Sequence, residues 1–365
     1  MGLKCGIVGL PNVGKSTLFN ALTSAKALAA NYPFATKDPN LGVITVPDPR
    51  LDTLADLVNP QKVIPTTVDI VDIAGLIKGA SKGEGLGNQF LGNIRETDAI
   101  LHVVRCFEDD NVVHVDGNVD PVRDKMIIDT ELILKDIETV EKKVDKFRRT
   151  AKSGDKEAKR IVEVGEALLA HLESEQPARS FDTSEEGEEV VKELLLLTAK
   201  PILYVCNVDI DSIEGGNAHT QAFRQAVAEE NAEVILISAG IEADIAELET
   251  KEERNEFIEE MGLTEPGVNK VIRASYSLLK LITYFTAGEK EVRAWTIEEG
   301  TKAPGAAGVI HTDFEKGFIR AEVIHYADYI AYGSESAARD NGKLNVEGKE
   351  YVVQDGDVMH FRFNV

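Results

Sequence analysis

The sequence is poor in cysteine, tryptophan and long apolar runs. Among its 365 residues it has 3 cysteines and 1 tryptophan. Cys5, Cys106 and Cys206 are far apart, and each lies in or beside an apolar segment. This spacing fits neither a disulfide framework nor a cysteine metal site, so we expect buried, reduced thiols. No apolar run approaches the roughly 20 residues that a membrane-spanning helix needs, which excludes that class of membrane protein.

The first residues also lack the signals of export and of lipid attachment. Met1 to Gly6 lead directly into an apolar segment, without the pattern of a signal peptide. Gly6 stands where N-myristoylation requires Ser or Thr. We therefore expect a cytoplasmic protein that does not associate with a membrane.

Basic residues are scarce as well. The chain has 40 Lys and Arg against 63 Asp and Glu, a formal net charge of −23. Such a charge repels nucleic acid at long range, so any RNA contact would need a local basic patch. One stretch meets this condition, because lysine and arginine greatly outnumber acidic residues between Lys142 and Arg160. The patch predicts either contact with RNA phosphates or an ordinary solvated helix surface, and both stay open.

The apolar pattern predicts an α/β fold with a mostly parallel sheet. Short apolar segments, several of them apolar on both faces, alternate with helical periods, which is typical of a parallel sheet covered on both sides. The expected strands are residues 4–9, 42–46, 67–73, 100–105, 202–206 and 234–237. A helix is expected from Gly14 to Thr23, directly after a glycine-containing loop.

Two regions depart from this alternation of strands and helices. From Arg123 to Lys200 the chain is long and charged, with apolar residues at helical spacing on either side of Ser153-Gly154-Asp155, which predicts an inserted antiparallel helical hairpin. After Leu281, frequent glycines separate short β-like segments, which predicts a small β-rich domain. The expected parts are therefore residues 1–122 with 200–279, residues 123–199, and residues 280–365.

The strongest motif is a phosphate-binding loop. Gly9 to Ser16 fits the pattern G-x-x-x-x-G-K-[ST], between a predicted strand and a predicted helix as that pattern requires. Its glycines let backbone N–H groups turn toward phosphates at a helix N-terminus. Lys15 is expected to neutralise the β- and γ-phosphates. The nucleotide-binding residues predicted here are Asn12, Val13, Gly14, Lys15, Ser16 and Thr17.

Further segments follow in the order that a nucleotide switch needs. Asp72 ends a predicted strand and is placed to bind a Mg²⁺ water, and Gly75 can offer its amide to the γ-phosphate. Thr36, in a polar loop, can reach the same ion when the γ-phosphate is present. The sequence therefore predicts a Mg²⁺ site made by Ser16, Thr36 and Asp72.

Two later strand ends predict the contacts to the base. Asn207 and Val208 close one strand, and Ser238 and Ala239 close the next, where a base-reading loop belongs. Nucleotidases specific for guanine read the base with Asn-Lys-x-Asp, whereas this chain has Asn207-Val208-Asp209-Ile210. Loss of the carboxylate that accepts hydrogen bonds from guanine favours ATP over GTP.

These residues resemble the Obg-like ATPases of the YchF subfamily, within the translation-factor-related P-loop class. The resemblance covers essentially the whole chain and is carried by residues 9–17, 31–36, 72–76, 83–88 and 311–317. It implies a P-loop nucleotidase domain, a helical insertion of coiled-coil type and a C-terminal TGS domain of the β-grasp fold. It also implies hydrolysis of ATP to ADP and phosphate, binding to the ribosome (50S or 70S) with contact to its large subunit, and a role in regulating translation or the stress response. Within that role, the basic patch would contact ribosomal RNA.

Two positions depart from the expected patterns. Leu76 stands where a switch nucleotidase usually has the glutamine that orients the attacking water, so the resemblance implies another way of positioning water and a slow intrinsic turnover. Asn12 is then a candidate ligand for K⁺, and the catalytic residues would be Lys15, Asn12 and Gly75. Ile210 replaces the Glu that ends the subfamily's base motif.

Two alternatives to a strict ATPase remain. Asp209 and Asp211 flank Ile210, and a shift of the loop by one residue would return a carboxylate to the base, so a GTPase or a nucleotidase of dual specificity stays possible. The other alternative belongs to a different class: a ribosome-binding regulatory factor in which hydrolysis is incidental. Leu76 favours the regulatory factor, whereas the intact Lys15, Ser16 and Asp72 favour the enzyme.

Overall fold

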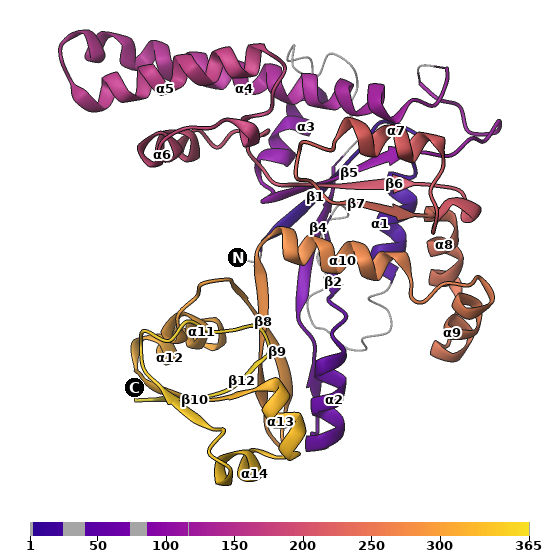
Figure 1. The fold of residues 1–365 in the computed structure, drawn as a ribbon, viewed down its shortest axis with the longest axis vertical. Coiled ribbons are helices and arrows are strands. Elements are labelled where there is room, and N and C mark those ends of the chain that lie inside the picture. The colour runs from indigo at the N-terminus through magenta and orange to yellow at the C-terminus, as the bar shows by residue number, and fades with distance from the viewer. Residues whose placement is uncertain (1–2, 25–40, 74–85, 116, 365) are drawn as a thin grey trace. The chain divides into compact units, whose positions relative to one another are not determined.

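The computed structural model describes residues 3–24, 41–73, 86–115 and 117–364 (Figure 1). Its contacts divide the chain into two compact units. The first unit comprises residues 1–42 and 69–271, and the second comprises residues 43–68 and 272–365. Thr36, Gly75 and Leu76 lie outside the described residues.

The first sheet confirms the predicted parallel α/β class. Its strand order is β2-β4-β1-β5-β6-β7, and all neighbours from β4 to β7 are parallel. Every residue of β5 and β6 is buried, as expected for central strands covered on both faces. The strands are β1 (Lys4–Val8), β2 (Leu41–Thr45), β4 (Thr67–Asp72), β5 (Ala99–Arg105), β6 (Ile202–Asn207) and β7 (Val234–Ile237).

Helices cover this sheet, and Figure 1 shows α1 beside α8 on one side and α4 running past α7. Because β1 runs parallel to its neighbours β4 and β5, the loop between β1 and α1 lies at the carboxyl ends of these strands. Ligands bind at this edge in open parallel sheets. Apart from α2, the helices of the described residues up to residue 278 are α1 (Lys15–Ser24), α3 (Leu86–Arg95), α4 (Pro121–Lys152), α5 (Lys156–Glu173), α6 (Glu185–Leu194), α7 (Ala218–Ala226), α8 (Ala239–Glu247), α9 (Lys251–Glu260) and α10 (Gly267–Leu278), with short 3₁₀ turns at Ala178–Ser180 and Ile210–Ser212.

The predicted helical hairpin is present as α4 and α5, which project from the rest of the first unit with α6 beside them (Figure 1). Asp155 begins α5 as an N-cap, since its carboxylate accepts the backbone N–H of Ala158 at 2.7 Å. The two helices share an apolar seam that includes Val140, Val144 and Leu168, all buried. The break at Ser153-Gly154-Asp155 was therefore predicted correctly.

A buried carboxylate closes the root of this hairpin. Asp136, on α4, is 1% exposed and accepts the backbone N–H of Leu197 at 2.8 Å and that of Thr198 at 2.7 Å. The hydroxyl of Thr198 donates to the same carboxylate at 2.6 Å. Because these bonds hold the segment that leads back into β6, the long insertion leaves and rejoins the first unit at a fixed place.

The second unit contains the β-rich C-terminal part that the glycine pattern predicted. Its sheet has the order β11-β10-β12-β8-β9-β3. The strands are β3 (Val63–Ile64), β8 (Leu281–Ala287), β9 (Val292–Glu298), β10 (Phe318–His325), β11 (Asn345–Glu347) and β12 (Asp357–Phe363); the helices are α2 (Pro49–Val58), α11 (Ala303–Ile310), α12 (Thr312–Lys316), α13 (Tyr326–Tyr332) and α14 (Glu335–Asp340). One apolar cluster includes Tyr284 and the alanines of α11, and the other joins α2 to Phe285 and Tyr329.

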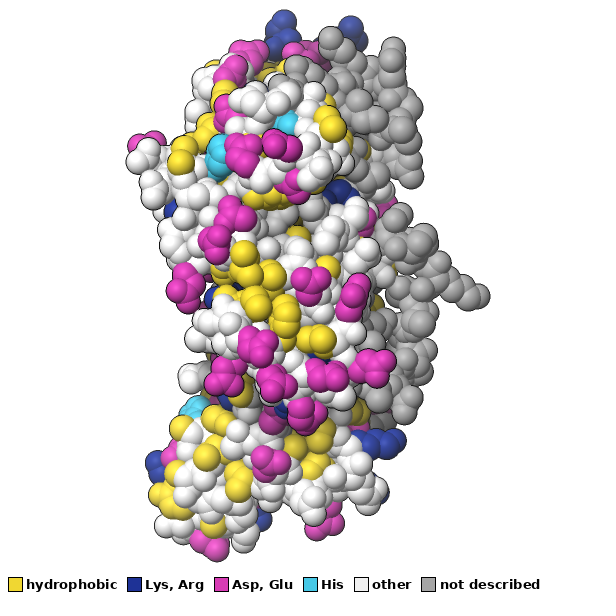
Figure 2. Space-filling view, turned by 90° about the vertical axis from the view of Figure 1, so that its right-hand side faces the viewer, with side chains coloured by type: hydrophobic (Ala, Val, Ile, Leu, Met, Phe, Trp, Pro, Cys, Tyr) yellow, Lys and Arg dark blue, Asp and Glu magenta, His cyan; other side chains and the backbone are white. Residues whose placement is uncertain are grey.

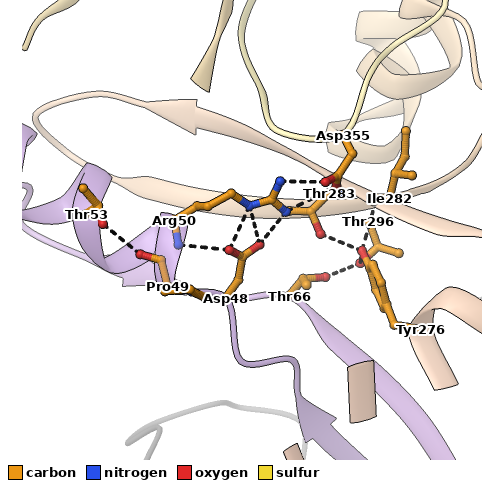
Figure 3. A network of polar contacts seen from close by, with 10 residues as sticks. All are labelled: Asp48, Pro49, Arg50, Thr53, Thr66, Tyr276, Ile282, Thr283, Thr296 and Asp355. Carbon is orange, nitrogen blue, oxygen red and sulfur yellow. Dashed lines mark hydrogen bonds and ion pairs between the residues drawn. The ribbon is translucent and has the colours of Figure 1, made fainter. Parts of the chain in front are cut away.

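The segment 43–68 differs from the predicted division. We assigned it to the nucleotidase part, but its contacts group it with residues 272–365. Strand β3 pairs with β9 in parallel, and Leu51 and Leu54 of α2 are buried against Phe285. Figure 3 shows the accompanying polar network, in which Arg50 lies between Asp48 and Asp355. The TGS assignment of residues 280–365 itself stays a prediction.

Within the described residues, no helix combines the length and the apolar character that crossing a membrane requires.

Candidate nucleotide site

The turn between β1 and α1 has the backbone shape that the glycine pattern predicted. Gly14 has a φ of +92°, and Asn12 a φ of +63°, both in the left-handed region. A Cβ at Gly14 would lie 2.2 Å from Nδ2 of Asn207, and one at Gly9 would lie 2.8 Å from the carbonyl oxygen of Val103. Any larger side chain at these two positions would therefore displace the loop from the sheet.

Lys15 and Asp72 meet at the start of α1. Lys15 begins the helix and is 9% exposed, and Asp72 ends β4, directly opposite Ile7 of β1. The Lys15 Nζ forms an ion pair with Oδ1 of Asp72. The structure thus brings together the predicted phosphate-binding cation and the predicted magnesium carboxylate, although 57 residues separate them in the sequence.

The oxygen donors near this pair suit a hard cation. Ser16 and Thr17 are exposed in the first turn of α1, beside Lys15. A serine hydroxyl and one carboxylate, completed by waters and phosphate oxygens, are a usual donor set for Mg²⁺. Among the described residues, no group of three or more His, Cys, Asp or Glu side chains could hold a metal on its own. A Mg²⁺ site built on Ser16 and Asp72 would therefore need the nucleotide for its completion.

Asn207 connects the phosphate-binding loop to the end of β7. Its side chain is buried; Nδ2 donates to the carbonyl of Val13 at 2.9 Å, and Oδ1 accepts the backbone N–H of Ala239 at 2.9 Å. Ser238 is the N-cap of α8, which begins at Ala239. The predicted base and phosphate residues are thus linked by direct hydrogen bonds.

The loop after Asn207 shows what stands at the base-reading positions. Val208 is 2% exposed, and its N–H donates to the carbonyl of Ile237 at 2.8 Å. Ile210 is 42% exposed, and Asp209 is exposed and accepts the hydroxyl of Ser212 at 2.7 Å. An apolar side chain therefore faces solvent at the position that carries the carboxylate in guanine-specific proteins.

Sequence reasoning missed the loop that follows β5. Asn12 Nδ2 donates to the carbonyl of Val113 at 3.0 Å, so this loop touches the phosphate-binding loop. The neighbouring His114 is buried, with Nε2 2.8 Å from Oδ2 of Asp124. No motif marks these residues, and only the folded chain brings them beside Asn12.

The cysteines are as expected. Cys5, Cys106 and Cys206 are free and buried. A hydrogen bond to Cys206, together with burial, raises the pKa of the Cys106 thiol. The Cys106 thiol is therefore held in its protonated, unreactive form.

Comparison with known proteins agrees with this site and extends over the full length. A model described as "50S ribosome-binding GTPase" matches residues 4–143, and the YchF-GTPase C-terminal model, described as "Protein of unknown function", matches residues 281–364. The protein of Escherichia coli O157:H7 named "Ribosome-binding ATPase YchF" is 58% identical, over 100% of both chains. The chain belongs to the YchF family.

Two further YchF proteins are similar to this chain in sequence, and one of them also in structure. The protein of Bacillus subtilis with the same name is 58% identical over 100% of both chains. The solved structure of the Schizosaccharomyces pombe YchF GTPase is 43% identical and superimposes with a TM-score of 0.90, covering 99% of this chain and 98% of that one. YchF membership and this superposition confirm the predicted family and the predicted fold class.

Proposed function

We propose that this protein is a Mg²⁺-dependent ATPase that binds the ribosome, and that it acts in the cytoplasm to regulate translation or the stress response. The observation that carries the proposal is the convergence of Lys15, Asp72 and Asn207 on one strand-loop-helix turn, in a chain of the YchF family. Relatives named ribosome-binding ATPases align with the chain from end to end.

In this proposal the phosphates lie on the backbone N–H groups of residues 12–17, at the N-terminus of α1. Lys15 is 9% exposed, so its charge is weakly screened and stabilises phosphate oxygens strongly. Asp72, now paired with the ammonium of Lys15, would help to hold Mg²⁺ through one of the waters of the ion. Bound Mg²⁺ would supply neutralisation of the phosphate charge.

The remaining ligands stay as expected from the sequence. Ser16 and Thr36 would complete the magnesium site, and the amide of Gly75 would bind the γ-phosphate. Asn12 is the candidate K⁺ ligand: its Nδ2 is engaged by Val113, while no hydrogen bond to its oxygen is present within the described ranges. An amide oxygen is the kind of group that a hard cation binds.

Base selection favours ATP. The base would lie against Asn207 and Val208 on one side and Ser238 and Ala239 on the other. The fourth motif position carries the apolar Ile210, and the Asp209 carboxylate accepts a hydrogen bond from Ser212, so in the described loop neither residue offers guanine a free carboxylate at that position. A site that lacks such a partner loses its preference for guanine.

Calorimetric titration of nucleotide-free protein with ATP and GTP, in Mg²⁺ and K⁺, tests the base preference. We expect tighter ATP binding, and we expect Ile210→Asp to shift the ratio of affinities toward GTP by about tenfold. The matched control is Ile210→Ala, which removes the apolar side chain without adding an acceptor and should leave the ratio unchanged. A wild-type preference for GTP would overturn the ATPase proposal.

Release of phosphate from ATP then tests hydrolysis. Lys15→Ala should lower the rate by a factor on the order of 100 or more, since it removes the main stabilising charge. The same variant separates the enzyme from the regulatory factor. A factor for which hydrolysis is incidental would keep its cellular role with Lys15→Ala, whereas an ATP-driven switch would lose it.

For the ribosome, we propose contact between the tip of the hairpin and RNA phosphates of the large subunit, within Lys142 to Arg160. Several basic residues of this patch are already engaged, since Lys142 pairs with Glu138, Lys143 with Glu193 and Arg148 with Glu166. Other basic residues are exposed and have no ion pair with any described residue: Arg149, Lys152, Lys156 and Lys159. This second set is available for phosphates.

Co-sedimentation with large ribosomal subunits at rising salt concentrations tests this contact. Changing Arg149, Lys152 and Lys156 to Glu should weaken binding and reduce its salt dependence, because each lost phosphate contact lowers the number of counterions released. The control carries the same charge reversals at Lys142, Lys143 and Arg148, and should weaken binding less. Equal effects of both triple variants would argue for general charge rather than a specific tip.

A further inference from the structure

Arg105 is a buried cation that the proposed chemistry does not use. It ends β5 and is 2% exposed. Its guanidinium donates from Nε to the carbonyl of Phe107 at 3.1 Å, from Nη2 to that of Asp109 at 3.2 Å and from Nη1 to that of Val112 at 2.8 Å. The guanidinium carbon also lies 4.5 Å from the centre of the Phe107 ring. No carboxylate of the described residues forms an ion pair with it.

Such a residue is costly for a protein interior. Burying a charge without a counter-ion is unfavourable, and three carbonyl dipoles compensate only part of the lost hydration. An apolar side chain would fill the same space without that cost. The arrangement is explained if the shape of the loop, rather than packing, is what Arg105 provides.

Besides Arg105, polar contacts at exposed residues hold the loop that follows β5. We call residues 107–113 the Arg105 loop. Asp109, Asp110 and Asn111 are exposed, and the side chain of Val113 is 74% exposed. Within the loop, Asp109 Oδ1 accepts the backbone N–H of Asn111 at 2.9 Å. The Val112 N–H also donates to the Asp109 carbonyl at 3.1 Å, and the exposed Glu108 lies 2.9 Å from Nε2 of His219. The three hydrogen bonds from the buried Arg105 side chain tie the loop backbone to the end of β5.

The Arg105 loop ends against the phosphate-binding loop. The Val113 carbonyl is the acceptor for Nδ2 of Asn12, whose φ of +63° is unusual for a residue with a side chain. A second link runs through the sheet, where Arg105 is directly opposite Asn207 and the N–H of Cys106 donates to the Asn207 carbonyl at 2.8 Å. Asn207 in turn holds the carbonyl of Val13. The two links therefore end on neighbouring residues of the phosphate-binding loop, the side chain of Asn12 and the carbonyl of Val13.

We infer that Arg105 is a positioning residue for the phosphate-binding loop. It fixes the Arg105 loop so that the Val113 carbonyl holds Asn12, and with it the N–H groups that line the phosphates. Arg105 acts through Asn12 and need not touch the nucleotide. The inference rests on the proposed nucleotide site, and it adds a residue on which the alignment of that site depends.

The planar fork of Arg105 is essential to this role. A guanidinium offers five N–H donors in a fixed plane and can reach three carbonyls at once, whereas an ammonium is a compact point charge. Arg105→Lys should therefore behave like Arg105→Met rather than like the wild type. We expect both to lower kcat/KM for ATP by about tenfold or more, because small misplacements near the reacting phosphate are costly.

A double-mutant cycle with Asn12→Ala separates this role from a general loss of structure. If Arg105 acts through Asn12, then Arg105→Met should change nucleotide binding and turnover much less in the Asn12→Ala background than in the wild type. The control is Arg254→Met. Arg254 is a partly buried arginine that donates to the Leu248 carbonyl, and its loss should leave kcat unchanged. Asp109→Ala, at an exposed position, disturbs the Arg105 loop without removing a buried group and should give a smaller loss that also disappears with Asn12→Ala.

The cycle is measured twice, with ADP binding by calorimetry and with ATP turnover. Turnover below detection in the wild type would contradict the proposed ATPase and leave the ADP cycle to decide the role of Arg105. Independent, multiplicative effects of Arg105→Met and Asn12→Ala would overturn the inference, as would wild-type behaviour of Arg105→Lys. If Arg105→Met fails to fold, the Asp109→Ala cycle decides in the same way.

Discussion

His102 is a second buried basic residue on β5, and it is held neutral. It is 1% exposed, its ring lies 5.6 Å from that of Tyr204, and its Nδ1 has no hydrogen-bond partner within the described part of the chain. Burial lowers its pKa from 6.5 to about 4, and the nearby Lys125 and Arg179 act in the same direction. The folded chain therefore resists protonation of this side chain.

This gives a prediction for stability in acid. Between pH 4 and 6.5 the unfolded chain binds a proton at His102 that the folded chain does not, so the contribution of His102 is complete above pH 6.5 and is lost as the pH falls toward 4. The full loss is roughly 3 kcal/mol. His102→Leu removes this titration. The free energy of unfolding of the variant, minus that of the wild type, should therefore rise by roughly 3 kcal/mol between pH 7 and pH 4.

Hydrogen exchange of the β5 and β6 amides measures this effect, because the only tryptophan, Trp295, lies in the second unit and does not report on the first. His171→Leu is a suitable control, because that ring is partly exposed and its Nε2 has polar partners, 3.1 Å from the carbonyl oxygen of Pro177 and 3.0 Å from the hydroxyl of Ser180. If the difference in the free energy of unfolding between His102→Leu and the wild type stays constant across this pH range, the prediction is wrong.

Single residues also show where sequence reasoning succeeds. Gly14, Lys15 and Ser16 are neighbours in the chain, so a local pattern was enough to predict their placement. Asn207 could be placed at a strand end, but its two hydrogen bonds depend on loops almost 200 and more than 30 residues away. Arg105 carries no motif, and its role depends wholly on tertiary structure.

The helical hairpin depends on one close approach between its two helices. A Cβ added at Gly165 of α5 would lie 2.4 Å from Cγ2 of Val144 on α4, which is buried. Gly165→Ala should therefore push the helices apart. Overpacking costs about 1 to 3 kcal/mol, and the better helix propensity of alanine returns up to about 1 kcal/mol, so we expect a net loss.

Thermal unfolding followed by far-ultraviolet circular dichroism measures this loss. Gly92→Ala is the matched control, because Gly92 is also helical but has no atom within 4 Å of an added Cβ. It should leave stability unchanged or raise it slightly. Adding Val144→Ala to Gly165→Ala should cost less than the sum of the two single changes. Equal melting temperatures for Gly165→Ala and Gly92→Ala would show that α4 and α5 have room to adjust to the added methyl group.

At the level of elements, periodicity predicted what is long and regular. The hairpin and the central strands carry strong local patterns, since their burial follows from sequence spacing alone. Strand β3 has only 2 residues, and it pairs with β9, which lies more than 200 residues away in the chain. A local pattern cannot reveal such a pair, so segment 43–68 was assigned by its neighbours in the sequence.

The net charge acts on the molecule as a whole. Figure 2 shows acidic side chains spread over one face, with few basic ones among them. With a net charge of −23, the long-range field opposes approach to RNA, so the proposed contact at the tip of the hairpin would have to overcome it locally. The composition was enough to show that the basic patch is an exception on an acidic protein. The structure was needed to show which of its lysines and arginines form ion pairs and which do not.

Segment 43–68 belongs to the second unit but interrupts the first unit in the sequence. It lies between the candidate magnesium ligands Thr36 and Asp72 in the sequence, while its own contacts belong to the second unit. Arg50 is its main polar anchor. The guanidinium is 2.8 Å from Asp48 and 2.6 Å from Asp355 (Figure 3). It also lies over the ring of Phe285. Asp355 also accepts the backbone N–H of Thr283 at 2.9 Å.

Loss of this anchor should destabilise the second unit. Arg50→Met leaves Asp48 and Asp355 without their shared cation, and because the Arg50 side chain is only 27% exposed, we expect a loss of about 1 to 2 kcal/mol. Arg339→Met is the control: Arg339 pairs with Glu335 on an exposed helix face, where ion pairs contribute about 0.5 kcal/mol or less. Arg339 also lies 3.9 Å from the buried Glu322, but that carboxylate keeps Arg320 and Arg362 as partners. Urea unfolding followed by Trp295 fluorescence reports on this unit directly. Equal midpoints for both variants would mean that β3 and the apolar face of α2 hold the segment without the ion pairs.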